Sequence, residues 1–286
     1  MRDSREKPVL RIGRIPYANL LPIFHALEAR FSLDGVRFVT GAPSELNRKL
    51  RAGLLDLSPS SSIEYGKFPD RYLLVPGLSV ASRSKVMSVV LLSNGPLRSL
   101  PADPVAVTAA SDTSVVLLEI LLREFLGKRN RLVRTTLSPV EALQKYPAYL
   151  AIGDAAIRAT LDGTASHATD LGAWWRKETG LPFVFALWIV SRAALGAKGE
   201  VLRRFGGMLL AAKKAARDLV RGNAHEAIGP AWIPAAWRAE YWRNLSYDLD
   251  EEAEGLRHFF RLAHRIGKIP AVPPLRFLEI GPAPVP

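Results

Sequence analysis

Two long, mostly apolar segments of strand length constrain the fold of this chain more than any other feature. They cover residues 85–93 and 183–190 and lie about 90 residues apart in a sequence of 286 residues. Around them, short strand-like runs alternate with helix-like runs, which is typical of an α/β protein with mostly parallel sheets. If each long segment passes from one lobe to the other, the residues between them form an inserted lobe. We therefore expect two lobes, the first from residues 1–86 and 190–286 and the second from residues 87–189.

Two helix-like stretches follow the second long segment. Apolar residues recur at i, i+3 and i+4 spacing from Val201 to Leu219, and a second stripe of this kind runs from Leu249 to Ile266. This spacing is typical of amphipathic helices that bury one face. We expect both apolar faces to pack into the core.

Several classes of site are excluded by what the sequence lacks. It has no cysteine, and so no disulfide framework, thiolate zinc site, iron–sulfur cluster or cysteine nucleophile. None of its five histidines pair at i, i+4 spacing, and no HExxH motif is present, so no metal site is predicted. GxSxG, GxxxxGK[ST] and a strand followed by GxGxxG are missing as well. Any chemistry must then use hydroxyls, amides and backbone N–H groups.

The positive charge is large but spread along the chain. Lys and Arg number 39 against 27 Asp and Glu, a formal net charge of +12, and residues 1–70, 71–190 and 191–286 carry +3, +4 and +5. Only residues 128–134 are densely basic, and we interpret them as a solvated loop at a helix end. Basic residues interleaved with aromatic ones, typical of nucleic-acid sites, are missing. We expect no nucleic-acid partner, although the charge would raise the encounter rate of a small anion.

Neither a membrane segment nor an export signal is visible. No apolar run approaches the roughly 18 residues that a membrane helix needs. The first residues carry charges of both signs, and no apolar segment follows a basic start. The sequence therefore predicts a cytoplasmic protein without a membrane partner.

Polar clusters lie at three predicted strand-to-helix junctions. They are residues 16–22, which include Asn19, the serine-rich residues 58–62, and residues 111–114. Each admits two interpretations, because the same side chains either cap a helix or bind a ligand. Taken together at equivalent junctions, the three clusters predict a pocket for a small anion in the cleft between the lobes.

At this level of detail the chain resembles the chorismate dehydratase family of the futalosine menaquinone pathway. The resemblance runs in order over residues 10–266 and is carried by the segments RIGRIPYANLLP (11–22), PSELN (43–47), SPSSSIEY (58–65), PGLS (76–79), VMSVVLLS (86–93), IGDAA (152–156), DLG (170–172) and TGLPFVFALW (179–188). It implies an α/β fold of the type II periplasmic-binding-protein-like class, with two lobes and an interlobe cleft. The implied activity is a lyase reaction without cofactor, which eliminates water from the dianion chorismate to give 3-[(1-carboxyvinyl)oxy]benzoate.

The resemblance also implies roles for individual residues. Asn19 and Ser88 match the positions expected to be catalytic. Residues expected to bind the substrate are Tyr17, Ser61, Ser111, Thr113, Ser114 and Asp154, and Asp154 admits helix capping as an equal alternative. The segment before Ser88 departs from the family pattern Asp-Gly-Pro-Val-Gly-Ser and reads Arg-Ser-Lys-Val-Met-Ser. Its Arg83 and Lys85 are expected at the rim of the cleft, where they either aid anion capture or mark a shifted substrate.

Three alternatives to the lyase remain open. One is a cytoplasmic small-anion binding protein of the same fold without catalysis. Another is the sister enzyme that acts later in the same pathway on a dehypoxanthine futalosine-type substrate. The third, a basic nucleic-acid-binding protein, has the least support.

Overall fold

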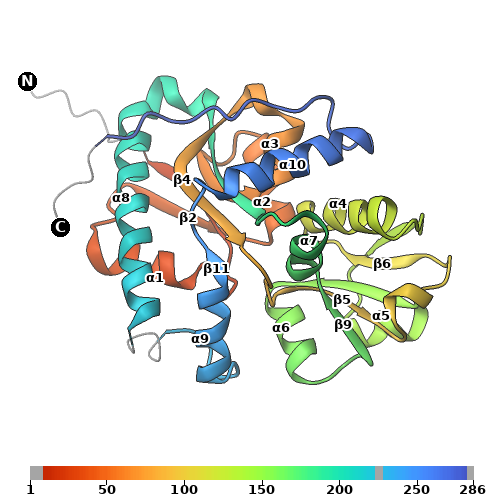
Figure 1. The fold of residues 1–286 in the computed structure, drawn as a ribbon. Helices are drawn as coiled ribbons and strands as arrows, with labels where there is room; N and C mark the ends of the chain where they lie inside the picture. The colour runs from red at the N-terminus through yellow and green to blue at the C-terminus, as the bar shows by residue number, and fades with distance from the viewer. Residues whose placement is uncertain (1–8, 223–227, 282–286) are drawn as a thin grey trace, which may run out of the picture.

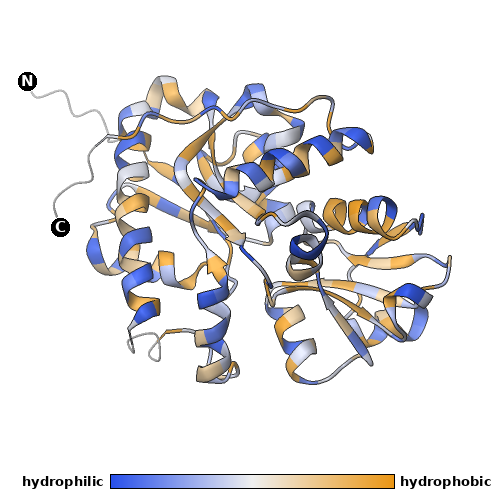
Figure 2. Ribbon diagram, viewed as in Figure 1, coloured by the Kyte–Doolittle hydropathy of each residue, from blue (hydrophilic) through white to orange (hydrophobic). Residues whose placement is uncertain are grey.

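The computed structural model describes residues 9–222 and 228–281, which form two mixed α/β layers (Figure 1). A six-stranded sheet has the order β11-β4-β10-β3-β1-β2, and a five-stranded sheet has the order β7-β6-β8-β5-β9. In Figure 2 the strands of both sheets are mostly apolar, and helices such as α8 (Leu195–Arg221) and α10 (Glu252–Arg265) combine hydrophilic and hydrophobic residues, whereas α4 (Thr113–Ile120) is mostly hydrophobic and buried. Each sheet thus has its own covering helices, as a two-lobed α/β fold requires.

The first sheet collects strands from both ends of the chain. Its strands are β1 (Leu10–Arg14), β2 (Val36–Thr40), β3 (Leu57–Ser61), β4 (Tyr72–Ser82), β10 (Phe183–Ser191) and β11 (Leu245–Ser246). The helices associated with it are α1 (Leu21–Arg30), α2 (Pro43–Arg51), α3 (Ser62–Lys67), α8 (Leu195–Arg221), α9 (Ala235–Asn244) and α10 (Glu252–Arg265). Helices α8 and α10 correspond to the two amphipathic helices predicted from the sequence, and α8 packs against α1 while α10 packs against β10.

The second sheet is built from the middle of the chain. Its strands are β5 (Val89–Ser93), β6 (Val105–Thr108), β7 (Leu132–Thr135), β8 (Ala148–Ile152) and β9 (His167–Asp170). Its helices are α4 (Thr113–Ile120), α5 (Pro139–Lys145), α6 (Gly153–Leu161) and α7 (Leu171–Thr179), and a π-helical turn, Leu121–Phe125, extends α4. Helices α4 and α6 begin soon after β6 and β8 end, so their N-termini lie at one edge of the sheet.

The expectation of mostly parallel sheets is wrong. Strand β1 is parallel to β2 and β3, but β10 is antiparallel to both β3 and β4, and β5 is antiparallel to β8 and β9. The reason is topological: β4 leads out of the first sheet towards the second, and β10 returns from the second sheet to the first. Neighbouring strands that leave and return must run in opposite directions.

The two long apolar segments also differ from the prediction. Strand β5 begins only at Val89, because residues 83–88 form the connection between the sheets and Met87 has a positive φ of 61°. All of β10 pairs within the first sheet. The lobe boundaries at 86/87 and 189/190 stay a prediction, and the register of β10 favours placing the second boundary before Phe183.

Over residues 9–222 and 228–281, no helix combines the length and the apolarity needed to cross a membrane.

Candidate active site

A small, partly open cavity lies where the two sheets meet, with a volume of about 60 Å³. Its lining comes from both sheets and their connections: Ile15, Tyr17, Asn19, Pro43, Ser61, Val80, Ser88, Val89, Ser111, Ser114, Ile152, Gly153, Phe185 and Ala186. Ligand pockets usually measure about 300–1,000 Å³, so a ligand of ordinary size fits here only if the two lobes move apart.

Six of the predicted site residues line this cavity together, although they come from distant parts of the sequence. They are Tyr17, Asn19, Ser61, Ser88, Ser111 and Ser114. The serine cluster lies differently from the sequence expectation, because Ser58–Ser61 belong to β3 itself and α3 begins at Ser62. Because successive side chains of a strand point to opposite faces of the sheet, Ser61 of β3 points towards the cavity and Ser60 points away from it.

Thr113 and Asp154 do not line the cavity. The Thr113 hydroxyl accepts a hydrogen bond from the Ile63 N–H at 3.1 Å, which joins α4 to α3. Oδ1 of Asp154 accepts a hydrogen bond from the Ala18 N–H at 3.1 Å, which joins α6 to the segment after β1. Both side chains bridge the two sheets, and their role in substrate binding stays a prediction.

The segment that carries Asn19 is fixed through its backbone. The indole Nε1 of Trp242 donates to the Ala18 carbonyl at 2.8 Å, and the hydroxyl of Tyr247 donates to the Asn19 carbonyl at 2.6 Å. The side-chain Oδ1 of Asn19 is buried and has no hydrogen-bond partner among the described residues. A buried amide oxygen without a partner costs roughly 1–3 kcal/mol. Because Asn19 lines the cavity, this oxygen is placed to accept a hydrogen bond from a ligand there.

Ser88 follows a connection that a single carboxylate organises. Asp170 accepts hydrogen bonds from the N–H groups of Val86 at 3.0 Å, Met87 at 2.6 Å and Ala173 at 2.9 Å. These bonds hold Met87 in its left-handed conformation, which a side chain other than glycine rarely adopts. The backbone turn then directs Ser88 into the cavity.

A tyrosine that sequence reasoning missed contacts the Ser88 side chain. Tyr241 of α9 is completely buried, and its hydroxyl donates to Ser88 Oγ at 2.9 Å. Burial raises the pKa of Tyr241 above its usual value, so the phenol remains protonated and available as a donor. Among the described residues, the acceptor given for the hydroxyl proton of Ser88 is the Val86 carbonyl at 3.4 Å. That distance is long for an O–H···O bond, which leaves the proton available to a ligand.

Several helices begin at or beside the cavity, and its described lining contains no carboxylate, lysine, arginine or histidine. Helix α2 begins at Pro43 and helix α6 begins at Gly153, and both of these residues line the cavity. Helix α3 begins directly after Ser61, and helix α4 begins directly after Asp112. Ser111 Oγ accepts from the Ser114 N–H at 3.2 Å and so caps α4. Helix N-termini carry partial positive charge and free N–H groups, which suit carboxylates.

The expected cationic rim is not formed by Arg83 and Lys85. Arg83 pairs with Glu252 at 3.0 Å and with Glu251 at 3.3 Å, and Lys85 pairs with Glu240 of α9. Neither residue lines the cavity. The prediction placed free positive charge at the cleft, but acidic side chains from α9 and the start of α10 neutralise it.

Tyr17 and Gly153 make the closest packing across the cavity. A Cβ atom on Gly153 would lie 2.8 Å from two ring carbons of Tyr17, and Gly153 has a φ of +60°. Glycine is required here both for space and for conformation. Burial raises the pKa of the adjacent Asp154 carboxyl, against the opposing effects of the Ala18 N–H and Arg158.

This pKa shift predicts how the stability of an Asp154→Asn variant depends on pH. A carboxyl whose pKa is raised in the folded state costs folding stability once it ionises, so the wild-type protein loses stability as pH rises from the usual Asp range through the raised value. We expect the free energy of unfolding of Asp154→Asn, relative to wild type, to increase from pH 4 to pH 7 in urea denaturation. Asp162→Asn, an exposed change at the end of α6, controls for the loss of one negative charge. A relative stability that falls over this range would show that hydrogen bonding to Ala18 dominates instead.

No metal site is formed in the described part of the chain, since no three side chains of His, Cys, Asp or Glu gather there. A family model described as menaquinone biosynthesis matches residues 10–265. A chorismate dehydratase of Thermus thermophilus is 39% identical over 197 residues, which cover 63% of this chain and 69% of that protein. A 1,4-dihydroxy-6-naphtoate synthase of the same organism is 29% identical over 263 residues, covering 88% of this chain and 92% of that protein.

Solved structures with a similar fold are distant in sequence. A Candida albicans protein described as having the generic periplasmic binding protein fold matches with a TM-score of 0.66 and 14% identity, covering 96% of this chain and 99% of its own. The alkanesulfonate-binding protein SsuA of Xanthomonas axonopodis matches with a TM-score of 0.63 and 19% identity, covering 96% and 97%. The fold is therefore that of the periplasmic binding proteins, as the sequence resemblance implied.

Proposed function

The chain belongs to the menaquinone biosynthesis family that includes chorismate dehydratases, and we propose that it eliminates water from chorismate to give 3-[(1-carboxyvinyl)oxy]benzoate. The observation that carries this proposal is the composition of the cavity. Asn19 presents an unpartnered amide oxygen, Ser88 presents a hydroxyl, and helix N-termini surround both without an ionised side chain. Such a site holds an anion and stabilises a leaving group, and it needs no bound cofactor for this reaction.

The proposed chemistry asks little of the protein beyond orientation. The ring C–O bond breaks, the neighbouring ring C–H loses its proton, and the electrons of that C–H bond complete the aromatic ring. In our mechanism the Ser88 hydroxyl donates a hydrogen bond to the departing hydroxide while the Asn19 amide orients the substrate. The cavity lining offers no carboxylate or imidazole as a base. A carboxylate of the substrate itself therefore takes the ring proton and passes it on to the departing hydroxide, which leaves as water.

The sister reaction is the second candidate. The naphthoate synthase relative aligns with more of this chain than the dehydratase does, but at lower identity. We favour the dehydratase because of the 39% identity and because the described cavity lining contains no carboxylate, imidazole or amine. The two candidates differ in substrate, so a direct assay distinguishes them.

Incubation of the purified protein with chorismate tests the proposal. We expect the absorbance of chorismate to decline and a new aromatic product to form. Asn19→Ala and Ser88→Ala should each lower kcat by about 100-fold or more, the size of effect seen when a donor to a developing charge is removed. Ser60→Ala is the matched control, because Ser60 is a buried serine of β3 that does not line the cavity and whose hydroxyl has no hydrogen-bond partner within residues 9–222 and 228–281.

Three outcomes would contradict the proposal. Unchanged chorismate with measurable binding would indicate a non-catalytic anion-binding protein. Turnover of a dehypoxanthine futalosine-type substrate in place of chorismate would indicate the sister enzyme. Full activity in Asn19→Ala or Ser88→Ala would remove that residue from the mechanism.

Tyr241 should act as a positioning residue through Ser88. Removing its hydroxyl in Tyr241→Phe deletes one hydrogen bond to Ser88 Oγ and loosens the orientation of that hydroxyl in the transition state. We expect kcat to fall about tenfold while KM stays within about twofold, because the interaction is made when the leaving group departs. Tyr72→Phe provides the control, since Tyr72 is buried and bonds Glu64 at 2.8 Å in the first sheet, away from the cavity. A rise in KM with unchanged kcat would assign Tyr241 to ground-state binding instead.

A further inference from the structure

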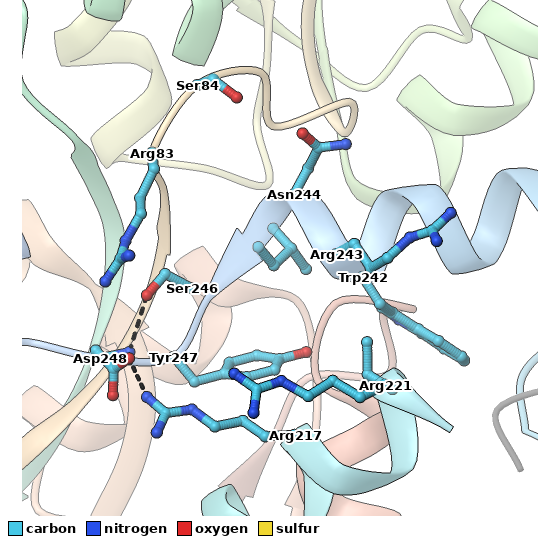
Figure 3. Close-up of a pocket in the computed structure, with 12 residues that line it drawn as sticks. Arg83, Ser84, Arg217, Arg221, Trp242, Arg243, Asn244, Ser246, Tyr247 and Asp248 are labelled. Atoms are coloured by element: carbon cyan, nitrogen blue, oxygen red, sulfur yellow. Dashed lines mark hydrogen bonds and ion pairs between the residues drawn. The ribbon is translucent and has the colours of Figure 1, made fainter. Parts of the chain in front are cut away.

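A second, larger pocket lies beside the segment that joins α9 to β11, and it has a volume of about 510 Å³ (Figure 3). It is lined by the end of β4, the end of α8 and residues 242–248. None of its lining residues lines the cavity between the sheets. The proposed reaction therefore does not use this pocket.

Arginine dominates the lining. Four arginines contribute, Arg83, Arg217, Arg221 and Arg243, against a single carboxylate, Asp248. Asp248 is already paired with Arg217 and with Lys213 at 2.9 Å, as Figure 3 shows for Arg217. Its negative charge is thus compensated without Arg221 or Arg243.

Arg221 and Arg243 are the cations available to a ligand. Both are exposed, and neither forms a salt bridge or hydrogen bond within residues 9–222 and 228–281. Arg221 extends over the region of Tyr247 in Figure 3, whereas Arg243 extends from α9. Guanidinium groups bind carboxylates and phosphates through two parallel N–H···O bonds, which makes unpaired arginines suited to oxyanions.

The pocket offers charge more than apolar surface. The rings of Trp242 and Tyr247 contribute to its wall but are only 1% and 4% exposed. A large apolar ligand would find little to contact, whereas an anion would meet the guanidinium groups of Arg221 and Arg243, which are unpaired within the described part of the chain. Arg83 and Arg217 are held in ion pairs. We propose that this pocket is a second binding site, for a compact oxyanion with at least two negative charges of the phosphate or polycarboxylate class.

The pocket adjoins the structure that positions Asn19. Trp242 and Tyr247 form part of its wall, and their polar atoms donate to the carbonyls of Ala18 and Asn19. One layer of side chains therefore separates the bound oxyanion from the backbone of the proposed catalytic segment.

Calorimetry with inorganic pyrophosphate and, separately, with citrate tests the site. We expect the wild-type protein to bind at least one of them at low ionic strength, with affinity falling as salt is added. The pair Arg221→Gln/Arg243→Gln should weaken binding at least tenfold. The pair Arg129→Gln/Arg131→Gln removes the same charge from an exposed loop beyond α4 and should keep wild-type affinity. Binding of pyrophosphate alone would point to a phosphate ligand, and binding of citrate alone to a polycarboxylate.

Binding is read without turnover, so this test does not depend on the proposed reaction. Thermal unfolding of both double variants verifies that they are folded. The site is refuted if the wild-type protein binds neither anion, or if both double variants lose affinity equally, which would reflect net charge alone. The proposal is also overturned if chorismate displaces the bound anion and does so equally well from the wild type and from Arg221→Gln/Arg243→Gln. That result would place the anion in the cavity between the sheets.

Discussion

The backbone of Ala18 and Asn19 is the constraint on which the site depends. It is held by three groups that come from distant parts of the chain: Asp154 of α6 accepts from Ala18, and Trp242 and Tyr247 donate to the two carbonyls. With its backbone bonds supplied in this way, the segment places the Asn19 amide oxygen in the cavity without a protein partner. One of the three contacts crosses between the sheets, so closure of the lobes and orientation of Asn19 are linked.

The uncharged cavity and the charged residues outside it fit the proposed elimination of water from an anionic substrate. The cavity contains dipoles and hydroxyls and, among the described residues, no arginine, and Arg83, which precedes the segment of Ser88, is held in an ion pair outside it. Helix N-termini attract carboxylates with partial charges that are fixed in direction. A lysine or arginine in the cavity would bind the dianion more strongly but would also pair with the substrate carboxylate that the proposed mechanism uses as a base.

The sequence predicts the parts of this site that follow strand ends. Asn19, Ser61 and Ser111 lie at the ends of early strands, where the α/β pattern brings polar residues to one edge, and they meet in the cavity. Tyr241 and Asp170 could not be found in this way, since their contacts with Ser88 and Met87 depend on tertiary packing over many residues. The only local signal was the cluster of aromatic residues between Trp237 and Tyr247, which is equally typical of core. The antiparallel strand pairs were not predicted, because the length of an apolar segment does not indicate in which direction the strand runs relative to its neighbours.

A structure of the Ser88→Ala variant with chorismate bound would test the central claim most directly. The account predicts that the ring hydroxyl of the substrate lies within hydrogen-bonding distance of the Asn19 amide, beside the space left by the Ser88 hydroxyl. It also predicts that the carboxylates face the N-termini of α3 and α4. Chorismate bound with its ring hydroxyl directed away from Asn19, or bound only among the arginines of the second pocket, would contradict the account.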